Sequence, residues 1–327
     1  MASVPLPAAT SALSMGIDLG GTKIYIVVLN ADGHVVWDRR IATPAGDYGA
    51  TLDALVALVV QARQDCGPCS IGIGTPGTVM PGGLMKNSNS QCLNGRPLLT
   101  DLSARLKQPV QMANDANCMA LSEASDGAGA GAPVVFAVIL GTGTGAGIAV
   151  HGRVLTGPNG LAGEWGHNPL PWAVPGSDPV LRCYCGQSGC IETLLSGPGM
   201  ARDHLAHSGT VLSAELIAAA ALRGDADCTA TLQRYIHRMA RALASIINLL
   251  DPDVIVLAGG LSRITALYEQ VPRLWGEWVV SGGQQDIVRT RLVASAHGDA
   301  SGVRGAAWLG RGAAVLTSAG TDSVSCG

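Results

Sequence analysis

The segment Val134-Val-Phe-Ala-Val-Ile-Leu-Gly-Thr-Gly-Thr-Gly-Ala-Gly147 joins an unbroken apolar run to glycines at alternate positions. The run Val134–Leu140 predicts a fully buried strand. A β-rich stretch, Ile148–Val150, comes next, where a Rossmann dinucleotide site would need a helix. Glycine lets the main chain approach a ligand closely, and Thr142 and Thr144 offer hydroxyls. We therefore expect a hairpin whose glycine turn can hold phosphate.

The same order of strand, glycine turn, hairpin and helix begins once before, at Met15. Gly16-Ile-Asp-Leu-Gly-Gly21 predicts a strand that ends in a glycine turn, and Ile24–Leu29 and Val35–Ile41 predict two further strands. Apolar residues at helical spacing follow over Asp47–Arg63. The two passes predict an α/β fold with an internal duplication and a cleft between its halves.

Apolar runs and helical spacing predict the other elements. Strands are expected at Ser70–Gly74, Val110–Ala113 and Val254–Leu257, and helices at Leu98–Leu106, Asn114–Ala124, Ala214–Leu222, Thr229–Leu250 and Gly302–Leu309. The Gly- and Ala-rich stretch Asp126–Pro133 indicates a boundary. We expect a disordered extension at 1–14, a small α/β domain at 15–126, a large α/β domain at 127–312 and a flexible tail at 313–327. The last helix can pack back on the small domain.

Composition limits the class of protein. The chain has 327 residues, of which 47% are apolar and 14% charged, enough for a core split between two domains. The net charge of −3 indicates no polyanion-binding surface, and no apolar run reaches spanning length without Gly, Pro or charge. An odd number of cysteines, most of them scattered, favours a reducing compartment over a disulfide framework. We expect a soluble, cytoplasmic protein that binds neither nucleic acid nor membrane.

One histidine and three cysteines stand in an order typical of a zinc site. Glu164-Trp-Gly-His167 precedes Cys183-x-Cys185-x4-Cys190, within an insertion at about 160–195. A Cys₃His set leaves no coordination position open, which indicates structural rather than catalytic zinc. Ordinary buried thiols are the weaker interpretation, because the three cysteines lie so close together with two glycines among them. Which imidazole completes the set stays open at this point.

The glutamates that flank the zinc set are candidates for binding a sugar. Glu164 lies among Gly163, Trp165 and Gly166, a setting that argues against a surface carboxylate. Carboxylates such as Glu164 and Glu192 can select vicinal hydroxyls, because each lost partner leaves a buried acceptor unsatisfied at about 1–3 kcal/mol. Paired glutamates also fit glycoside hydrolysis, but the two phosphate-type turns argue against it.

The first glycine turn is a second candidate phosphate site. Asp18-Leu-Gly-Gly-Thr-Lys23 places a carboxylate at a strand end, followed by two glycines, a threonine and a lysine. Backbone N–H groups in such a turn can hold phosphate oxygens, and Asp18 can hold Mg²⁺ directly or through water. Taken alone, this segment favours a tight hairpin with a surface lysine, because short glycine turns are common, and the Walker spacing of a P-loop is absent.

Asn114-Asp115 stands where a strand gives way to a helix. Either residue could be an N-cap, worth about 1 kcal/mol to the helix. A carboxylate at the carboxyl end of a central strand instead faces the crevice of an α/β fold. There Asp115 could accept the proton of a hydroxyl that attacks phosphorus, as a general base does in phosphoryl transfer.

Together these motifs resemble the signature of the ROK family (repressors, open reading frames and sugar kinases). The matching runs, in order from about Met15 to Trp308, are Asp18–Lys23, Asn114-Asp115-Ala-Asn117, Gly141-Thr-Gly-x-Gly145, Glu164–His167 and the very specific Cys183-x-Cys-Gly-x-x-Gly-Cys-x-Glu192. Lys86–Ser90, Leu93–Gly95 and His167–Trp172 are more similar to bacterial ROK fructokinases (the manno(fructo)kinase type) than to the N-acetylglucosamine kinases, and glucokinases are a looser match.

The resemblance implies an actin/hexokinase-like (ribonuclease H-like) fold with ATP in the cleft between two domains. It implies transfer of the γ-phosphate of ATP to the 6-hydroxyl of a hexose, with fructose first and mannose and glucose as further substrates. An N-acetylglucosamine kinase or glucokinase is the alternative. The implied cofactors are ATP, Mg²⁺ and structural Zn²⁺, and the implied assembly is a homodimer.

The resemblance also implies a role for each motif residue. Asp115 would be the base that deprotonates the sugar. The other sugar contacts would be Gly77, Asn89, Asn114, Glu164, His167 and Glu192. The nucleotide contacts would be Asp18, Gly20, Gly21, Thr22, Lys23, Thr142, Gly143, Gly259 and Gly260. The zinc ligands would be His167, Cys183, Cys185 and Cys190, with the second ring nitrogen of His167 turned to the sugar.

A sugar-responsive repressor is the alternative from a different class, since the family contains repressors. Repressors need a DNA-reading module, usually ahead of the first strand. The residues before Met15 carry no Lys or Arg. We therefore favour an enzyme. A sugar-binding protein without turnover is disfavoured because Asp115 and both glycine turns are intact.

Overall fold

The computed structural model describes residues 13–312, apart from 45, 81, 89 and 281–286. Residues 1–12 of the expected extension 1–14, the candidate sugar contact Asn89 and the tail 313–327 therefore lie outside the described residues. At the end of that extension the expectation is wrong, because Ser14 is buried and begins the first strand. The chain forms two compact units. Unit 1 lies within Met1–Asp115, Arg153–Ala162 and Ala306–Gly327, and unit 2 consists of Ala116–Gly152 and Gly163–Gly305. The functional domain limits expected from the sequence stay predictions, because contacts alone do not say what a unit binds.

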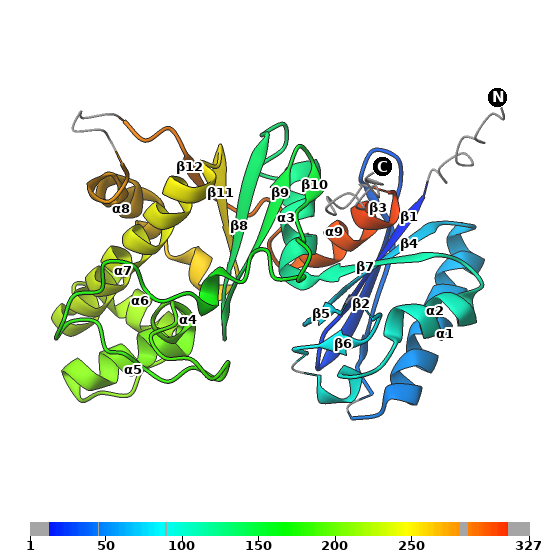
Figure 1. Cartoon of the computed structure of the whole chain (residues 1–327), viewed down its shortest axis with the longest axis horizontal. Helices are drawn as coiled ribbons and strands as arrows, with labels where there is room; N and C mark the ends of the chain where they lie inside the picture. Colours follow the sequence, from blue (N-terminus) through cyan, green and yellow to red (C-terminus); the bar gives the residue numbers. More distant parts are fainter. Residues whose placement is uncertain (1–12, 45, 81, 89, 281–286, 313–327) are drawn as a thin grey trace, which may run out of the picture. The chain divides into compact units, whose positions relative to one another are not determined.

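Unit 1 is built on a five-stranded mixed sheet with the order β3-β2-β1-β4-β7 (Figure 1). Its strands are β1 (Ser14–Leu19), β2 (Lys23–Leu29), β3 (Val35–Ala42), β4 (Ser70–Thr75) and β7 (Val110–Asn114). The first three form an antiparallel meander, whereas β1, β4 and β7 run parallel. The carboxyl ends of these parallel strands therefore share one edge of the sheet, where ligands bind in open α/β folds.

Two helices, α1 (Tyr48–Cys66) and α2 (Leu98–Leu106), cover one face of this sheet. The buried residues of that core include Ile17, Ile26 and Ile73 from the strands and Leu55 and Leu102 from the helices. On the sheet, a Cβ at Gly72 would stand 2.0 Å from the carbonyl oxygen of Ala306 in α9 (Ser301–Gly310). Only glycine therefore lets this helix pack so closely.

A second sheet has the strand order β10-β9-β8-β11-β12, of which β10 falls within the residues of unit 1 and the other strands within unit 2. These strands are β8 (Val134–Leu140), β9 (Thr144–Val150), β10 (Arg153–Val154), β11 (Val254–Ala258) and β12 (Arg291–Ala294). β8 and β9 are antiparallel, and β8, β11 and β12 are parallel. The order matches that of the first sheet position by position, which confirms the duplicated α/β fold predicted from the two glycine-turn motifs.

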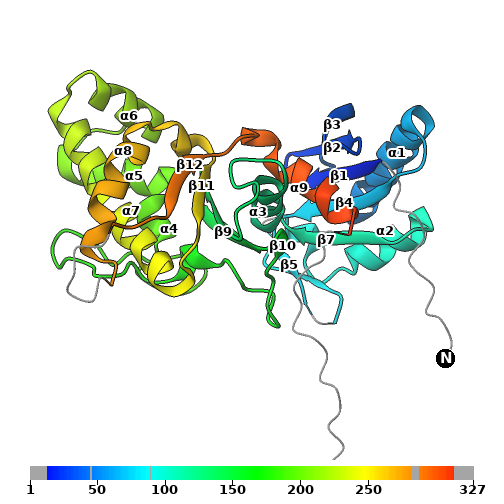
Figure 2. The same cartoon turned by 90° about the horizontal axis from the view of Figure 1, so that it is seen from above.

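Alternate residues of β8 enter different cores. Phe136 and Val138 pack with α7 (Ala226–Leu250), whereas Val135 and Ala137 pack with α3 (Asp115–Ser125). Figure 2 shows α3 on one side of this sheet and the helices α5 to α8 on the other. These are α5 (Gly197–Ser208), α6 (Ala214–Leu222), α7 and α8 (Ala266–Leu274), preceded by the short α4 (Glu192–Leu195). The continuous apolar character of β8 follows from burial on both faces.

The remaining elements are short. They are β5 (Thr78–Val79), β6 (Met85–Lys86) and the 3₁₀ turns η1 (Gln91–Leu93), η2 (Trp165–His167), η3 (Gly260–Arg263), η4 (Trp275–Glu277) and η5 (Gly298–Ala300). Sequence patterns did not predict α5, α8 or β12. The start of α5, Gly197-Pro-Gly199, lacks helical periodicity, but the Ser196 hydroxyl caps it by accepting the Gly199 N–H at 3.2 Å. Among the described helices, none is both long and apolar enough to cross a bilayer.

Candidate active site and metal centre

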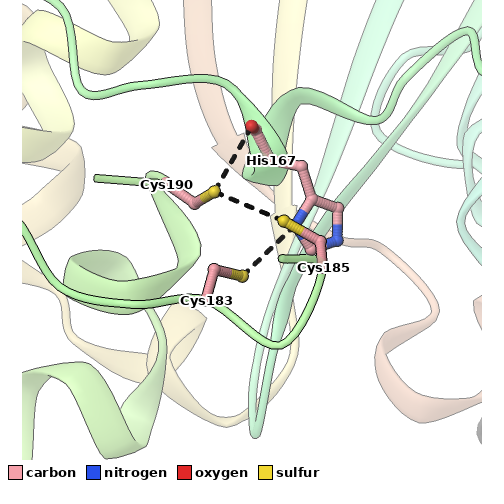
Figure 3. A group of neighbouring side chains, drawn as sticks. All are labelled: His167, Cys183, Cys185 and Cys190. Atoms are coloured by element: carbon pink, nitrogen blue, oxygen red, sulfur yellow. Dashed lines mark hydrogen bonds between the residues drawn. The ribbon is translucent and has the colours of Figure 1, made fainter. Parts of the chain in front are cut away.

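One histidine and three cysteines converge in unit 2. The candidate ligand atoms of His167, Cys183, Cys185 and Cys190 all lie within 4.8 Å of one another (Figure 3). The Sγ atoms of Cys185 and Cys190 are 3.6 Å apart, and His167 Nδ1 is 3.6 Å from Cys183 Sγ. Tetrahedral Zn–S and Zn–N bonds of ordinary length would separate such atoms by about 3.5–3.8 Å. The arrangement therefore fits a single zinc ion.

The backbone around the cysteines folds back on itself. The N–H of Leu170 donates to Gly189 O at 3.1 Å, and the N–H of Gly189 donates to Leu181 O at 2.8 Å. Gly186 and Gly189 have positive φ angles of 94° and 79°. Left-handed backbone favours glycine, so the two glycines of the cysteine run make the tight turns that bring its thiols together.

The thiols differ in acidity because their surroundings differ. A hydrogen bond from the backbone N–H of Gln187 lowers the pKa of Cys185. Burial raises the pKa of Cys183, and it raises the pKa of Cys190 to about 12. Zinc binds thiolates, so a zinc ion that bound here would release protons and would bind more tightly as the pH rises.

Glu192 joins this cluster to the second glycine turn. Its Oε2 accepts the N–H of Thr144 at 3.0 Å, and its Oε1 lies 3.9 Å from Cys183 Sγ. A Cβ at Gly143 would stand 2.7 Å from Oε2. Gly143 is therefore required for the carboxylate to reach the turn. This linking contact was not foreseen from the sequence, which assigned Glu192 to a sugar hydroxyl alone.

The glycine run after β8 serves two different purposes. Gly141 donates its N–H to Gly143 O at 2.9 Å, which closes the turn, and Thr142 at its tip is exposed. Gly145 and Gly147 instead belong to β9, and a Cβ at Gly147 would stand 2.3 Å from Ala116 O. The sequence predicted one ligand-binding run, whereas its second half gives β9 room to pack against the start of α3.

A pocket of about 320 Å³ lies in unit 2 beside η3. Its apolar wall comes mainly from α6, including Ala218 and Leu222, and its polar groups include Glu215 and Arg263. Gly260, predicted to lie near the nucleotide, lines this pocket. The preceding Gly259 has φ of 84°, and its Cβ would stand 2.4 Å from a carbonyl oxygen of β8, so no other residue fits there without strain.

The structure corrects the setting expected for Glu164. Its side chain is exposed, whereas the sequence argued against a surface carboxylate. The apolar neighbour Trp165 takes the buried position instead and packs edge-on against Phe136 at 5.9 Å. An exposed Glu164 remains accessible to a ligand.

Tyr184 occupies the outer side of His167, where the family resemblance implied a sugar contact. Its hydroxyl lies 3.1 Å from His167 Nε2, and the two rings meet edge to face with centroids 5.2 Å apart. The only sequence signal for this residue was its place between Cys183 and Cys185.

A buried ion network anchors the segment that leads to the cysteines. Asp178 accepts hydrogen bonds from Arg238 and Arg241 of α7, each at 2.8 Å, and from the N–H of Val174 at 2.7 Å. Burial alone would raise the pKa of Asp178, but these bonds together lower it. Arg241 also donates to Trp172 O at 2.6 Å. The residues between His167 and Cys183 carry no motif that would have predicted this network.

In unit 1, the end of β7 meets the turn after β4. Asn114 donates its side-chain N–H to Gly77 O at 3.2 Å, and Asp115 follows as the first residue of α3. Gly77 has φ of 84°, and its Cβ would stand 2.4 Å from Lys86 O. These candidate sugar residues are therefore brought together, and glycine is required at the turn.

The first glycine turn is exposed. Gly20 donates its N–H to Lys23 O at 2.9 Å, and Gly21, Thr22 and Lys23 all face solvent. Asp18 lies at the base of the turn, where burial raises its pKa against the opposing charges of Lys23 and Arg40. A positive ion or a phosphate-bound Mg²⁺ would relieve the cost of burying this carboxylate.

Comparisons with known proteins agree with these features. The ROK family model matches residues 14–313. An N-acetyl-D-glucosamine kinase from Salmonella paratyphi A is 41% identical over 302 residues, covering 90% of this chain and 98% of the relative. A ROK family glucokinase from Streptomyces griseus, solved with glucose and AMPPNP, is similar with a TM-score of 0.70, 28% identity and coverage of 91% and 98%.

The same fold also occurs in a regulator. A ROK family transcriptional regulator, a homologue of the E. coli MLC protein, is similar with a TM-score of 0.78 and 26% identity, covering 92% of this chain and 78% of that one. The family match over nearly the whole chain, together with these relatives, shows that this chain belongs to the ROK family.

Proposed function

We propose that this protein is an ATP-dependent sugar kinase that phosphorylates the 6-hydroxyl of a hexose, with N-acetyl-D-glucosamine as its first candidate substrate. The observation that carries the proposal is the link made by Glu192. One of its oxygens accepts the Thr144 N–H beside the second glycine turn, and the other faces the zinc-type cluster at Cys183. In this proposal, the residues that would bind the sugar are thereby attached to the turn that would bind phosphate.

Each candidate residue has a definite part in this reaction. Asp115 would accept the proton of the 6-hydroxyl as that oxygen attacks the γ-phosphorus. Asn114, Gly77, Glu164, His167 and Glu192 would bind the sugar. The turns Gly20–Lys23 and Thr142–Gly143 would hold phosphate oxygens through backbone N–H groups, with Asp18 beside a phosphate-bound Mg²⁺.

The nucleotide and the metal have candidate places in unit 2. The apolar wall and polar rim of the pocket at Gly260 suit the base and ribose of ATP. His167, Cys183, Cys185 and Cys190 would hold zinc, which supplies structural bracing when bound, because all four positions are filled by protein.

The choice of sugar rests on the relatives. The 41% identical relative is an N-acetyl-D-glucosamine kinase, so the expected preference for fructose is not confirmed. Fructose is the second candidate, supported by the fructokinase-like stretches Lys86–Ser90 and His167–Trp172. Selectivity among hexoses depends on a few polar contacts. These few residues contribute little to the overall sequence identity, so a high identity to one kinase does not by itself fix the preferred sugar.

A panel of hexoses tests the proposal. ADP release is measured with N-acetyl-D-glucosamine, fructose, mannose and glucose, and kcat/KM is compared. We expect N-acetyl-D-glucosamine to be phosphorylated most efficiently. A higher value for fructose would replace the first candidate by the second. No turnover of any hexose, with a sugar-dependent shift of DNA in a gel at low salt, would favour a regulator. Homodimer formation stays a prediction, which light scattering can test.

A further inference from the structure

The two ring nitrogens of His167 face different partners. Nδ1 faces the thiol cluster, 3.6 Å from Cys183 Sγ, whereas Nε2 lies 3.1 Å from the hydroxyl oxygen of Tyr184. The His167 and Tyr184 rings meet at 86°, so the hydroxyl reaches the imidazole from its edge. The imidazole is thus held from the side opposite the cysteines by a residue that belongs to the same cysteine run.

A neutral imidazole has one N–H and one lone pair, and a hydrogen bond to one nitrogen decides which is which. A metal at the thiols needs the lone pair of Nδ1, so the proton must reside on Nε2. The oxygen of Tyr184 is in position to accept that proton in a hydrogen bond. Outer partners of this kind orient metal-binding histidines in many proteins.

The same position at Nε2 is the one that a sugar hydroxyl would need under the proposed function. Tyr184 is 82% exposed, so its side chain can leave the imidazole without opening the core. We propose that Tyr184 is a positioning residue which holds His167 in its metal-binding tautomer and vacates Nε2 when a sugar hydroxyl takes its place. The second half of this inference rests on the proposed function, and the first half does not.

The substitution Tyr184→Phe removes the hydroxyl and keeps the ring. Tyr48→Phe is the matched control, because the hydroxyl of Tyr48 donates to Asp101 in unit 1, at 2.6 Å. Zinc affinity is measured by competition with a chelator, without sugar or ATP. We expect about a 10-fold loss for Tyr184→Phe, the lower end of the range for outer partners, and no change for Tyr48→Phe. Equal zinc affinity of Tyr184→Phe and wild type would overturn the inference.

The tautomer can be observed directly. In cadmium-loaded wild-type protein, NMR couplings between the metal and the ring should identify Nδ1 of His167 as the ligand. Coupling through Nε2 would overturn the inference, as would a wild-type protein that binds no metal at all. Neither result depends on whether the protein phosphorylates a hexose, so the proposed function is tested separately.

Whereas zinc affinity should fall in Tyr184→Phe, the affinity for the sugar should rise. At saturating zinc, Tyr184→Phe should lower the KM for the sugar by roughly 2- to 10-fold, the scale of one net hydrogen bond, with kcat unchanged. A merely structural role would weaken zinc and sugar binding together. A raised KM would mean that Tyr184 contacts the sugar itself. The proposal that Tyr184 vacates Nε2 for a sugar hydroxyl would then be wrong.

Discussion

The two glycine turns occupy the same position in two sheets of the same strand order, yet they are built differently. The turn in unit 1 runs from Gly20 to Lys23 between paired strands, and its side chains face solvent. The turn in unit 2, Gly141 to Gly143, is one residue shorter and is backed by the carboxylate of Glu192. A duplicated backbone thus provides two phosphate-type turns, and contacts from outside the repeat make them different.

The largest expected effect concerns the strand ends. In unit 1, β7 ends at Asn114 and Asp115 follows, whereas in unit 2 the matching strand β12 is followed by Ser295, whose hydroxyl donates to buried Glu123 at 2.6 Å. Asp115→Asn should lower kcat by about 10²–10⁴ through loss of the base. ADP release with saturating sugar measures this loss.

Ser295→Ala is the matched control, because it alters the corresponding strand end in the other unit. It removes the hydrogen bonds that the Ser295 hydroxyl makes with Glu123, Ser301 and the Gly298 N–H, costs about 1–3 kcal/mol of stability and should leave kcat near wild type. If folded Asp115→Asn turns over as fast as this control, Asp115 is not the base.

The next largest effect concerns stability and contrasts a buried ion pair in unit 2 with an exposed ion pair in unit 1. In unit 2, Asp178 is buried between Arg238 and Arg241, whereas in unit 1 Asp53 pairs with Arg105 at the surface. Asp178→Asn should cost about 3 kcal/mol, because buried Arg241 loses the carboxylate it pairs with, whereas Arg238 keeps its ion pair with Asp203. Asp53→Asn should cost under about 1 kcal/mol, because solvent screens the exposed pair. Urea denaturation measures both.

The same variants predict how stability depends on pH. The hydrogen bonds from Arg241 and Arg238 outweigh burial and lower the pKa of Asp178 in the folded protein. The stabilisation is therefore fully present above the unfolded pKa, near 3.9, and is lost as the pH falls through the lower folded value. The difference between wild type and Asp178→Asn should shrink in acid. A constant difference down to pH 2 would contradict this assignment.

The smallest expected effect is a difference in kcat/KM between alanine substitutions at two glycines of the same turn. A Cβ at Gly143 would stand 2.7 Å from Glu192 Oε2, whereas a Cβ at Gly141 meets nothing within 4 Å. Gly143→Ala should displace the carboxylate from the Thr144 N–H and lower kcat/KM by about 10- to 100-fold, the scale of one hydrogen bond to a charged group. Gly141→Ala should stay near wild type. Equal losses in the two variants would indicate a general effect on the turn.

Long periodic segments were predicted well. The limits of α2, α6 and β8 agree with the structure residue for residue, because each is an uninterrupted apolar or helical pattern. Helix α5 was missed because its first residues, Gly197-Pro-Gly199, lack such a pattern. The half-buried edge strand β12 carries too short an apolar signal to be recognised.

The candidate site was predicted in part. The thiols and His167 were found by their order along the chain, and the structure brings them together. Tyr184 and the buried partners of Asp178 were missed. Tyrosine, aspartate and arginine are common on protein surfaces and in helices, so these residues formed no distinctive sequence pattern. Their importance here comes from the contacts they make in the folded chain.

The order of residues alone established the family, the duplicated α/β fold and the zinc-type ligand set, because these depend on local patterns and on residue types with few alternative uses. Only the folded chain revealed that Glu192 joins the thiol cluster to a glycine turn, that the Tyr184 hydroxyl lies beside the outer nitrogen of His167 and that α7 anchors the segment before the cysteines. Such contacts arise where distant segments pack together, and no spacing along the chain encodes the distance between their side chains.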